Sequence, residues 1–223
     1  MILIFGASKG VGKALADTYV DKTTILISRQ KPTLKKNQKF LSIDIKKINF
    51  EEINNKIKFE NIEAVYFPVG LVLENDNLNL DYQEMELLMR TNFLSIIKIT
   101  DYLIKSKKLS KSCLICFFSS VTTLLPRDKN IIYCASKQSL NSYYKSLKTY
   151  VSIHKLNIRV CLIILGFVNT SMSKNIKTFF PKMEPERLAK YINKKSYKLE
   201  GVYYIPFYWF FIKILINIIP ENI

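Results

Sequence analysis

Met1-Ile-Leu-Ile-Phe-Gly-Ala-Ser-Lys-Gly-Val-Gly12 is the stretch of this 223-residue sequence that decides the fold. Its first five residues form a continuous apolar run, which is typical of a strand buried on both faces of a parallel sheet. Gly6, Gly10 and Gly12 follow, and residues 13–20 then have the spacing of a helix. The order of strand, glycine loop and helix suits a pyrophosphate, which binds backbone N–H groups at a helix N-terminus. An ordinary tight turn is the alternative, because the spacing G-x-x-x-G-x-G differs from the commoner G-x-G-x-x-G.

Short apolar runs recur along the chain and alternate with segments of helical periodicity. We expect strands at residues 1–5, 24–28, 39–43, 63–67, 112–118, 157–165 and 201–205, and helices at 13–20, 48–59, 82–105, 130–154, 207–219 and from Pro185. This alternation predicts an α/β fold with a doubly wound parallel sheet of about seven strands and helices on both faces. No linker rich in Gly, Pro or Ser divides the chain, so residues 1–206 are expected to form one domain and residues 207–223 an apolar C-terminal helix.

The second predicted strand ends at Ser28-Arg29, where an acidic residue would bind the ribose hydroxyls of NAD. Arg29 instead offers a planar fork for the 2′-phosphate of NADP, and Lys9 could reach the same phosphate. Both are alternatively solvated surface cations. Asp44 follows the third strand, where its carboxylate could accept a hydrogen bond from an adenine or cap the next turn.

A predicted strand ends in Ser119-Ser120, and the helix that follows carries Tyr133 and Lys137. Positions i and i+4 share a helix face, so the phenol and the ammonium can point at one place. A nearby cation favours the phenolate, whose ordinary pKa is about 10. The serine could then bind a substrate carbonyl or hydroxyl while the tyrosine transfers a proton. The alternative is a surface Tyr/Lys pair after an ordinary loop.

Two further sets of polar residues lie where they could serve a site. Asn92 falls on the buried stripe of residues 82–105, where an unbonded amide would cost about 1–3 kcal/mol. It is therefore either satisfied by backbone groups or placed to organise a water. Val168 and Thr170 follow the sixth strand, at the end of the sheet where ligands bind, and could hold the amide of a cofactor.

Together these motifs resemble the classical short-chain dehydrogenase/reductase family over residues 1 to about 170. The correspondence comprises the cofactor loop (Gly6, Gly10, Gly12), the helix asparagine (Asn92), the catalytic serine thirteen residues before the tyrosine (Ser120) and the Tyr-x-x-x-Lys motif (Tyr133, Lys137). The resemblance implies a single-domain Rossmann fold, a proton relay that includes Asn92, and a homodimer or homotetramer. Lys9 and Arg29 are similar to the residues of NADP-preferring members. The cofactor-binding residues expected for NADP(H) are Gly6, Ser8, Lys9, Gly10, Val11, Gly12, Ser28, Arg29, Asp44, Ile45, Gly70, Tyr133, Lys137, Val168 and Thr170.

The resemblance implies an NADPH-dependent oxidoreductase that reduces a carbonyl to an alcohol, or catalyses the reverse, with Asn92, Ser120, Tyr133 and Lys137 as the catalytic residues. A small lipid-like or lipid-linked molecule is the expected substrate. One alternative is a 3-oxoacyl-carrier-protein reductase, whose acidic carrier would find a basic surface. Another, from a different class, is a non-catalytic NADP-binding sensor or scaffold.

Three segments depart from the family pattern. Phe67-Pro68-Val69-Gly70 stands where the family has Asn-Asn-Ala-Gly, so only the glycine is kept, and Leu165-Gly166 replaces the usual Pro-Gly. The segment after Thr170 is short, because the next predicted helix begins near Pro185. Such a short substrate lid implies an open site or a contribution from elsewhere in the chain.

The C-terminal helix, residues 207–219, is apolar on nearly every side except at Lys213 and Asn217. Its length of about 20 Å falls short of a hydrocarbon core of about 30 Å, so it is not expected to span a membrane. Nearby aromatic and basic residues are the mixture typical of a segment in the interface of an anionic bilayer, namely Tyr204, Tyr208, Trp209, Lys194, Lys195 and Lys198. Packing against the core or a partner subunit is the alternative.

The formal net charge of +16 suits phosphates, an acidic partner, a membrane surface or nucleic acid, but it is spread over the whole chain. No basic block interleaved with aromatics stands out, which disfavours specific nucleic-acid binding. Cys113 and Cys116 form a C-x-x-C inside a predicted strand, so their side chains should face opposite ways and no metal site is expected. Reduced buried thiols, and an N-terminal run too short for a signal peptide, predict a cytoplasmic protein, with peripheral membrane association left open.

Overall fold

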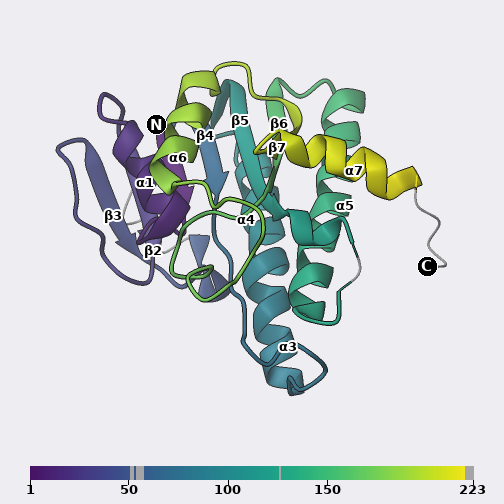
Figure 1. Cartoon of the computed structure of the whole chain (residues 1–223). Coiled ribbons are helices and arrows are strands. Elements are labelled where there is room, and N and C mark those ends of the chain that lie inside the picture. The colour runs from purple at the N-terminus through teal and green to yellow at the C-terminus, as the bar shows by residue number, and fades with distance from the viewer. Residues whose placement is uncertain (51–52, 54–57, 126, 219–223) are drawn as a thin grey trace.

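The computed structural model describes residues 1–50, 53, 58–125 and 127–218, and it contains one seven-stranded sheet between two layers of helices (Figure 1). The strand order is β3-β2-β1-β4-β5-β6-β7, and every neighbouring pair is parallel. The strands are β1 Ile2–Phe5, β2 Thr24–Ser28, β3 Gln38–Ser42, β4 Ile62–Phe67, β5 Leu109–Ser120, β6 Ile158–Leu165 and β7 Gly201–Ile205. This arrangement confirms the predicted doubly wound parallel sheet.

The helices connect these strands in the expected alternation. They are α1 Gly10–Thr18, α3 Tyr82–Met89, α4 Ser95–Lys105, α5 Ile131–Ile153, α6 Pro185–Lys195 and α7 Tyr208–Ile218, with short 3-10 turns η1 Ile45–Lys47 and η3 Val121–Thr123. The expected helix at 48–59 lies largely outside the described residues, as does residue 219.

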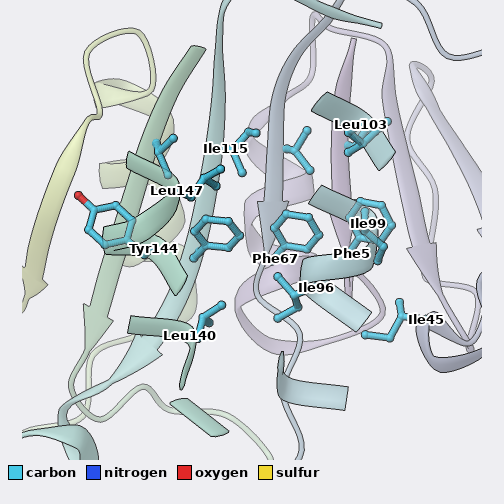
Figure 2. Close-up of a cluster of buried hydrophobic side chains, with 14 of the residues drawn as sticks. Phe5, Ile45, Phe67, Ile96, Ile99, Leu103, Ile115, Leu140, Tyr144 and Leu147 are labelled. Atoms are coloured by element: carbon cyan, nitrogen blue, oxygen red, sulfur yellow. The ribbon is translucent and has the colours of Figure 1, made fainter. Parts of the chain in front are cut away.

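The two faces of the sheet bury two separate apolar clusters, because successive strand residues point to opposite faces. Leu3, Phe67 and Ile115 belong to one cluster, which α4 and α5 cover. Figure 2 shows how α4 contributes Ile96, Ile99 and Leu103 there, while α5 contributes Leu140, Tyr144 and Leu147. The opposite face packs against α1 and α6 through residues such as Leu15 and Leu188. Cys113 and Cys116 fall in different clusters, which confirms that their side chains face opposite ways.

One predicted helix differs in a way that matters for the site. Residues 82–105 do not form a continuous α-helix, because a π-helical turn, η2 Arg90–Leu94, separates α3 from α4. A π-helical turn inserts one extra residue and is often found at functional sites. Here it contains Asn92, which is fully buried.

Candidate active site

Three loops converge at the carboxyl ends of the central strands. An added Cβ on Gly6 would lie 3.0 Å from Cα of Val69, and one on Gly10 would lie 3.2 Å from Cγ2 of Thr170. The glycine loop therefore contacts both the loop after β4 and the loop after β6. Larger residues at these glycines would force the three loops apart, so the glycines fix the shape of this end of the sheet.

Tyr133 and Lys137 lie on α5 beside the end of β5, as their spacing predicts. The Lys137 ammonium is buried, donates a hydrogen bond to the carbonyl of Phe118 at 3.0 Å, and lies 5.9 Å from the ring centroid of Tyr133. Ser120 follows Phe118 by two residues and forms a hydrogen bond with the Tyr133 phenol. The structure thus brings three of the four predicted catalytic side chains together.

The hydroxyl of Ser120 also caps the short turn η3. Its oxygen accepts hydrogen bonds from the amide and the hydroxyl of Thr122, at 3.2 and 2.9 Å. A hydroxyl has one donor and two acceptor positions, so a Ser120 oxygen used twice as acceptor can still donate its own hydrogen.

Burial shifts the pKa of both α5 groups toward their neutral forms. Burial raises the pKa of Tyr133 to about 12, and the hydrogen bond with Ser120 lowers it by less. Burial lowers the pKa of Lys137 to about 8. The net shift of the phenol is upward, the reverse of what a neighbouring cation alone would give. At neutral pH the phenol therefore holds its proton, which is the form that a proton donor requires.

Asn92 fastens the loop after β4 to the π-helical turn. Its side-chain oxygen accepts from the amide of Leu71 at 2.7 Å, and its side-chain nitrogen donates to the Leu71 carbonyl at 2.9 Å and to Ser136 Oγ at 3.1 Å. An added Cβ on the preceding Gly70 would lie 3.7 Å from Nζ of Lys137 and 3.9 Å from Oδ1 of Asn92. The amide is thus satisfied by protein groups, and it holds Gly70 beside the lysine.

Asp76 is a residue at this site that the sequence did not reveal. Its carboxylate is buried and accepts hydrogen bonds from the amides of Ile132 and Tyr133, both at 2.8 Å. Asn130, the residue directly before α5, is in the left-handed conformation and its side chain makes no capping bond. Asp76 therefore caps α5 from the loop between β4 and α3, and it fixes the backbone of the predicted catalytic tyrosine.

Of the residues predicted to bind the nucleotide, some lie on the surface and others are buried. Lys9 and Arg29 are both exposed, and Ser28 donates to the carbonyl of Gln30 at 2.8 Å. Asp44 caps η1 by accepting from the amide of Lys46 at 3.1 Å, which is the alternative left open for it. Ile45 is buried in the hydrophobic cluster under α4.

We call the segment after β6 together with α7 the substrate side, because the substrate is expected there. The backbone amide of Asn169 donates a hydrogen bond to the carbonyl of Met183 at 2.8 Å. This bond closes residues 171–182 into a loop that we call the lid. Phe180 in the lid packs on the indole of Trp209 with 4.6 Å between ring centroids. An added Cβ on Gly166 would lie only 2.2 Å from Nε1 of Trp209. The indole thus lies against Gly166, so α7 supports the loop that contains Val168 and Thr170.

Neither a metal centre nor a membrane span is found in the described part of the chain. No group of three or more His, Cys, Asp or Glu side chains is arranged to hold a metal ion there. No helix among these residues is long and apolar enough to cross a bilayer.

Comparison with known proteins places these features in a family. A sequence model described as short chain dehydrogenase matches residues 1–179. A Drosophila melanogaster protein, dehydrogenase/reductase SDR family protein 7-like, is 26% identical over 197 residues, which cover 80% of this chain and 60% of the relative. A 3-oxoacyl-[acyl-carrier-protein] reductase of Buchnera aphidicola is 26% identical over 191 residues, which cover 79% of this chain and 77% of the relative.

The fold is also similar to that of solved structures. The crystal structure of a short chain dehydrogenase family protein from Francisella tularensis matches with a TM-score of 0.78 and 22% identity, covering 92% of this chain and 96% of that protein. The present chain spans less than two thirds of the Drosophila relative, namely 60% of its length.

Proposed function

The chain belongs to the short-chain dehydrogenase family, and on that premise we propose that it is an NADPH-dependent oxidoreductase that reduces a carbonyl to an alcohol or catalyses the reverse. The observation that carries this proposal is the grouping of Tyr133, Lys137 and Ser120 at the end of β5. A phenol that keeps its proton at neutral pH can supply the proton that the substrate oxygen must gain in the reducing direction.

The residues at the glycine loop fit a dinucleotide. The side chain of Lys9, the residue before α1, makes no capping hydrogen bond, so the first amides of α1 can receive a phosphate. The Gly10 position lacks the Cβ that would narrow the gap to Thr170. In addition, the Ser119 hydroxyl is buried at the end of β5 and has no hydrogen-bond partner within the described residues. Each of these features leaves room or bonding capacity for a bound cofactor.

In this proposal each site residue has a separate task. Ser120 donates its hydroxyl hydrogen to the substrate oxygen, and Tyr133 transfers to that oxygen the proton that completes the alcohol. NADPH, when bound, supplies the hydride that the carbonyl carbon accepts. Lys137 holds the nicotinamide ribose with the donors that Phe118 does not take, since an ammonium carries three. Asn92 holds Gly70 beside Lys137, where a water that returns a proton to Tyr133 would lie.

The preference for NADPH over NADH is proposed from Lys9 and Arg29. Both side chains are exposed, and neither has an ion-pair partner among the residues that the structure describes. A guanidinium group matches a phosphate with two parallel hydrogen bonds, which the 2′-phosphate of NADPH offers and NADH lacks.

A panel of ketones and aldehydes tests the proposed reaction, with NADPH that carries deuterium at C4 as the reductant. We expect NADPH to be consumed only when a carbonyl compound is present, and the deuterium to appear on the carbinol carbon. Tight NADPH binding together with no transfer of label to any apolar, aromatic or polar carbonyl would favour the sensor or scaffold alternative.

A 3-oxoacyl-carrier-protein reductase is the second candidate for the same site. It is supported by the similarity to the Buchnera protein and by a net charge of +16, which would attract an acidic carrier. Free acyl carrier protein should then compete with a small 3-oxoacyl substrate, whereas a reductase of free lipid-like substrates should be unaffected by it.

The proposal also includes the assembly and location of the protein. We expect a homodimer or homotetramer in the cytoplasm, with peripheral contact to the inner face of a membrane.

A further inference from the structure

The outward face of α7 is mostly apolar, with Asn217 as the one exposed polar residue of the helix. Six residues at positions 207, 210, 211, 214, 215 and 218 are between 36% and 73% exposed, and all six are Phe, Ile or Leu. Their spacing of three, one, three, one and three residues places them on one side of the helix. The exposed residues of α6 are, in contrast, mainly charged, such as Glu186, Arg187 and Lys190. The normal pattern of a surface helix is therefore reversed in α7.

Only one end of α7 is fixed to the domain. Trp209 is its single buried residue, and Figure 1 shows the helix (yellow) leading away from the sheet. The described residues thus leave uncovered the apolar stripe, which we define as Phe207, Phe210, Phe211, Ile214, Leu215 and Ile218.

The lid extends this apolar surface toward the candidate site. Phe180 stacks on the ring of Tyr208 with 5.9 Å between centroids, and its neighbour Phe179 is almost fully exposed. Met172 and Ile176 in the same lid are also exposed. Cε of Met172 would lie 3.7 Å from a Cβ added to Gly70, the residue beside Lys137. Apolar side chains of the lid therefore lie both against the first turn of α7 and beside Gly70.

The charge of this region is uniformly positive. The lid carries Lys174, Lys177 and Lys182 and contains no acidic residue, and α7 carries Lys213 and no acidic residue. Lys174 and Lys177 are exposed beside Ile176. Exposed apolar side chains next to lysines match a bilayer surface with anionic headgroups, which accepts the apolar groups between its acyl chains and attracts the cations.

We propose that the stripe on α7 and the lysines of the lid together dock the protein on an anionic bilayer, and that the site takes its carbonyl substrate from that bilayer. The charge favours this occupant over a second copy of the chain, since a second copy would bring the same lysines and no acidic residue from its lid or α7 to pair with them. The second part of the proposal, an apolar substrate that enters between lid and α7, rests on the proposed reductase function.

Sedimentation of the full chain with vesicles tests the docking without any need for turnover. Vesicles of phosphatidylcholine with phosphatidylserine are compared with phosphatidylcholine alone, and we expect about tenfold stronger binding to the anionic vesicles. Phe211→Ser with Leu215→Ser should weaken that binding about tenfold, and so should Lys174→Gln with Lys177→Gln. The matched controls are Leu78→Ser with Ile153→Ser, which are apolar residues elsewhere that are even more exposed, and Lys145→Gln with Lys148→Gln on α5. Both control pairs should bind like the unmodified chain.

Three results would overturn the proposal. Equal binding to both kinds of vesicle would show that anionic headgroups are not recognised. Equal binding by the Phe211→Ser, Leu215→Ser variant and its control would show that the stripe does not contact the bilayer. A dimer in sedimentation velocity that disappears only in that variant, with vesicle binding unchanged, would assign the stripe to a second copy.

The substrate part has its own readout. Anionic vesicles should raise kcat/KM for an apolar ketone in the unmodified enzyme but not in the Phe211→Ser, Leu215→Ser variant, while a water-soluble ketone is reduced equally by both. An equal rise in both would contradict delivery through the bilayer. Vesicle binding by a chain that reduces no carbonyl would refute the proposed function and leave the docking intact.

Discussion

The two sides of the sheet's carboxyl edge are built in different ways. On the nucleotide side, formed by the loops after β1 and β2, an added Cβ on Gly12 would lie 2.2 Å from the backbone oxygen of Gly6, six residues away. On the substrate side, an added Cβ on Gly166 would meet the indole of Trp209, which comes from a different helix. The close approach at Gly12 is therefore local, between backbone atoms of one loop, whereas the approach at Gly166 joins two elements distant in sequence. The glycine loop still contacts the second side, because Gly10 packs against Thr170.

The largest expected effect is the loss of stability when alanine replaces Gly166 or Gly12, and it tests the difference between the two sides. Gly166→Ala should reduce the free energy of unfolding by about 3 kcal/mol, because the new methyl group overlaps the Trp209 ring. Combined with Trp209→Ala, the same change should show a favourable coupling of about 2 kcal/mol in a double-mutant cycle measured by urea unfolding. Gly12→Ala should be at least as destabilising and should show no coupling to Trp209→Ala. Coupling in both cycles, or in neither, would contradict the difference between the two sides.

Asp76→Asn tests whether the catalytic helix depends on a contact between distant residues. An asparagine oxygen can accept from one of the two amides of Ile132 and Tyr133 but turns its NH₂ toward the other. We expect kcat to fall about 30-fold, which corresponds to about 2 kcal/mol, while the Kd for NADPH changes less than about twofold. Asp128→Asn, an exposed carboxylate in the preceding loop, is the control. A lower Tm with unchanged kcat would reduce Asp76 to a purely structural role.

Lys137 lies between the two sides, and its burial predicts how stability depends on pH. Its pKa is about 8 in the folded chain, whereas an unfolded lysine keeps its proton up to about pH 10.4. Between about pH 8 and about pH 10.4, Lys137 is mostly protonated in the unfolded chain and mostly neutral in the folded chain. The free energy of unfolding therefore rises with pH in this range. The free energy of unfolding of the native chain minus that of Lys137→Met should increase by about 2 kcal/mol from about pH 7 to about pH 9.5. If this difference in the free energy of unfolding stays constant over the range, the pKa of Lys137 is not lowered by folding.

The smallest effect is expected at the nucleotide side, where Arg29 is exposed. Arg29→Gln should raise the Kd for NADPH about tenfold, or about 1.4 kcal/mol, and leave the Kd for NADH unchanged. Lys31→Gln in the same loop is the control for a general change in charge. An equal loss of both cofactors would show that Arg29 does not bind the 2′-phosphate.

What could be predicted from the sequence follows the same division. The apolar runs and the glycine spacing predicted the strands and the glycine loop, because these depend on residues close together in the chain. The Tyr133 and Lys137 pair was found because four residues make one helical turn. Asp76 was missed because its partners are 56 and 57 residues away, and because Asn130 is a residue type that normally caps helices. The contact between Gly166 and Trp209 also joins two elements that are distant in the chain, so it could not be predicted. The sequence showed only that Leu165-Gly166 replaces the usual Pro-Gly.

The most direct test of the central claim is the rate of hydride transfer in Tyr133→Phe, measured in a single turnover after NADPH has been titrated into the same sample. The phenylalanine keeps the ring against Lys137 but removes the proton that the substrate oxygen must receive. We predict an unchanged Kd for NADPH and a hydride transfer slower by about a thousandfold or more, within the range for loss of a positioned proton donor. Transfer within a few fold of the native rate would contradict the assignment of Tyr133 as the proton donor.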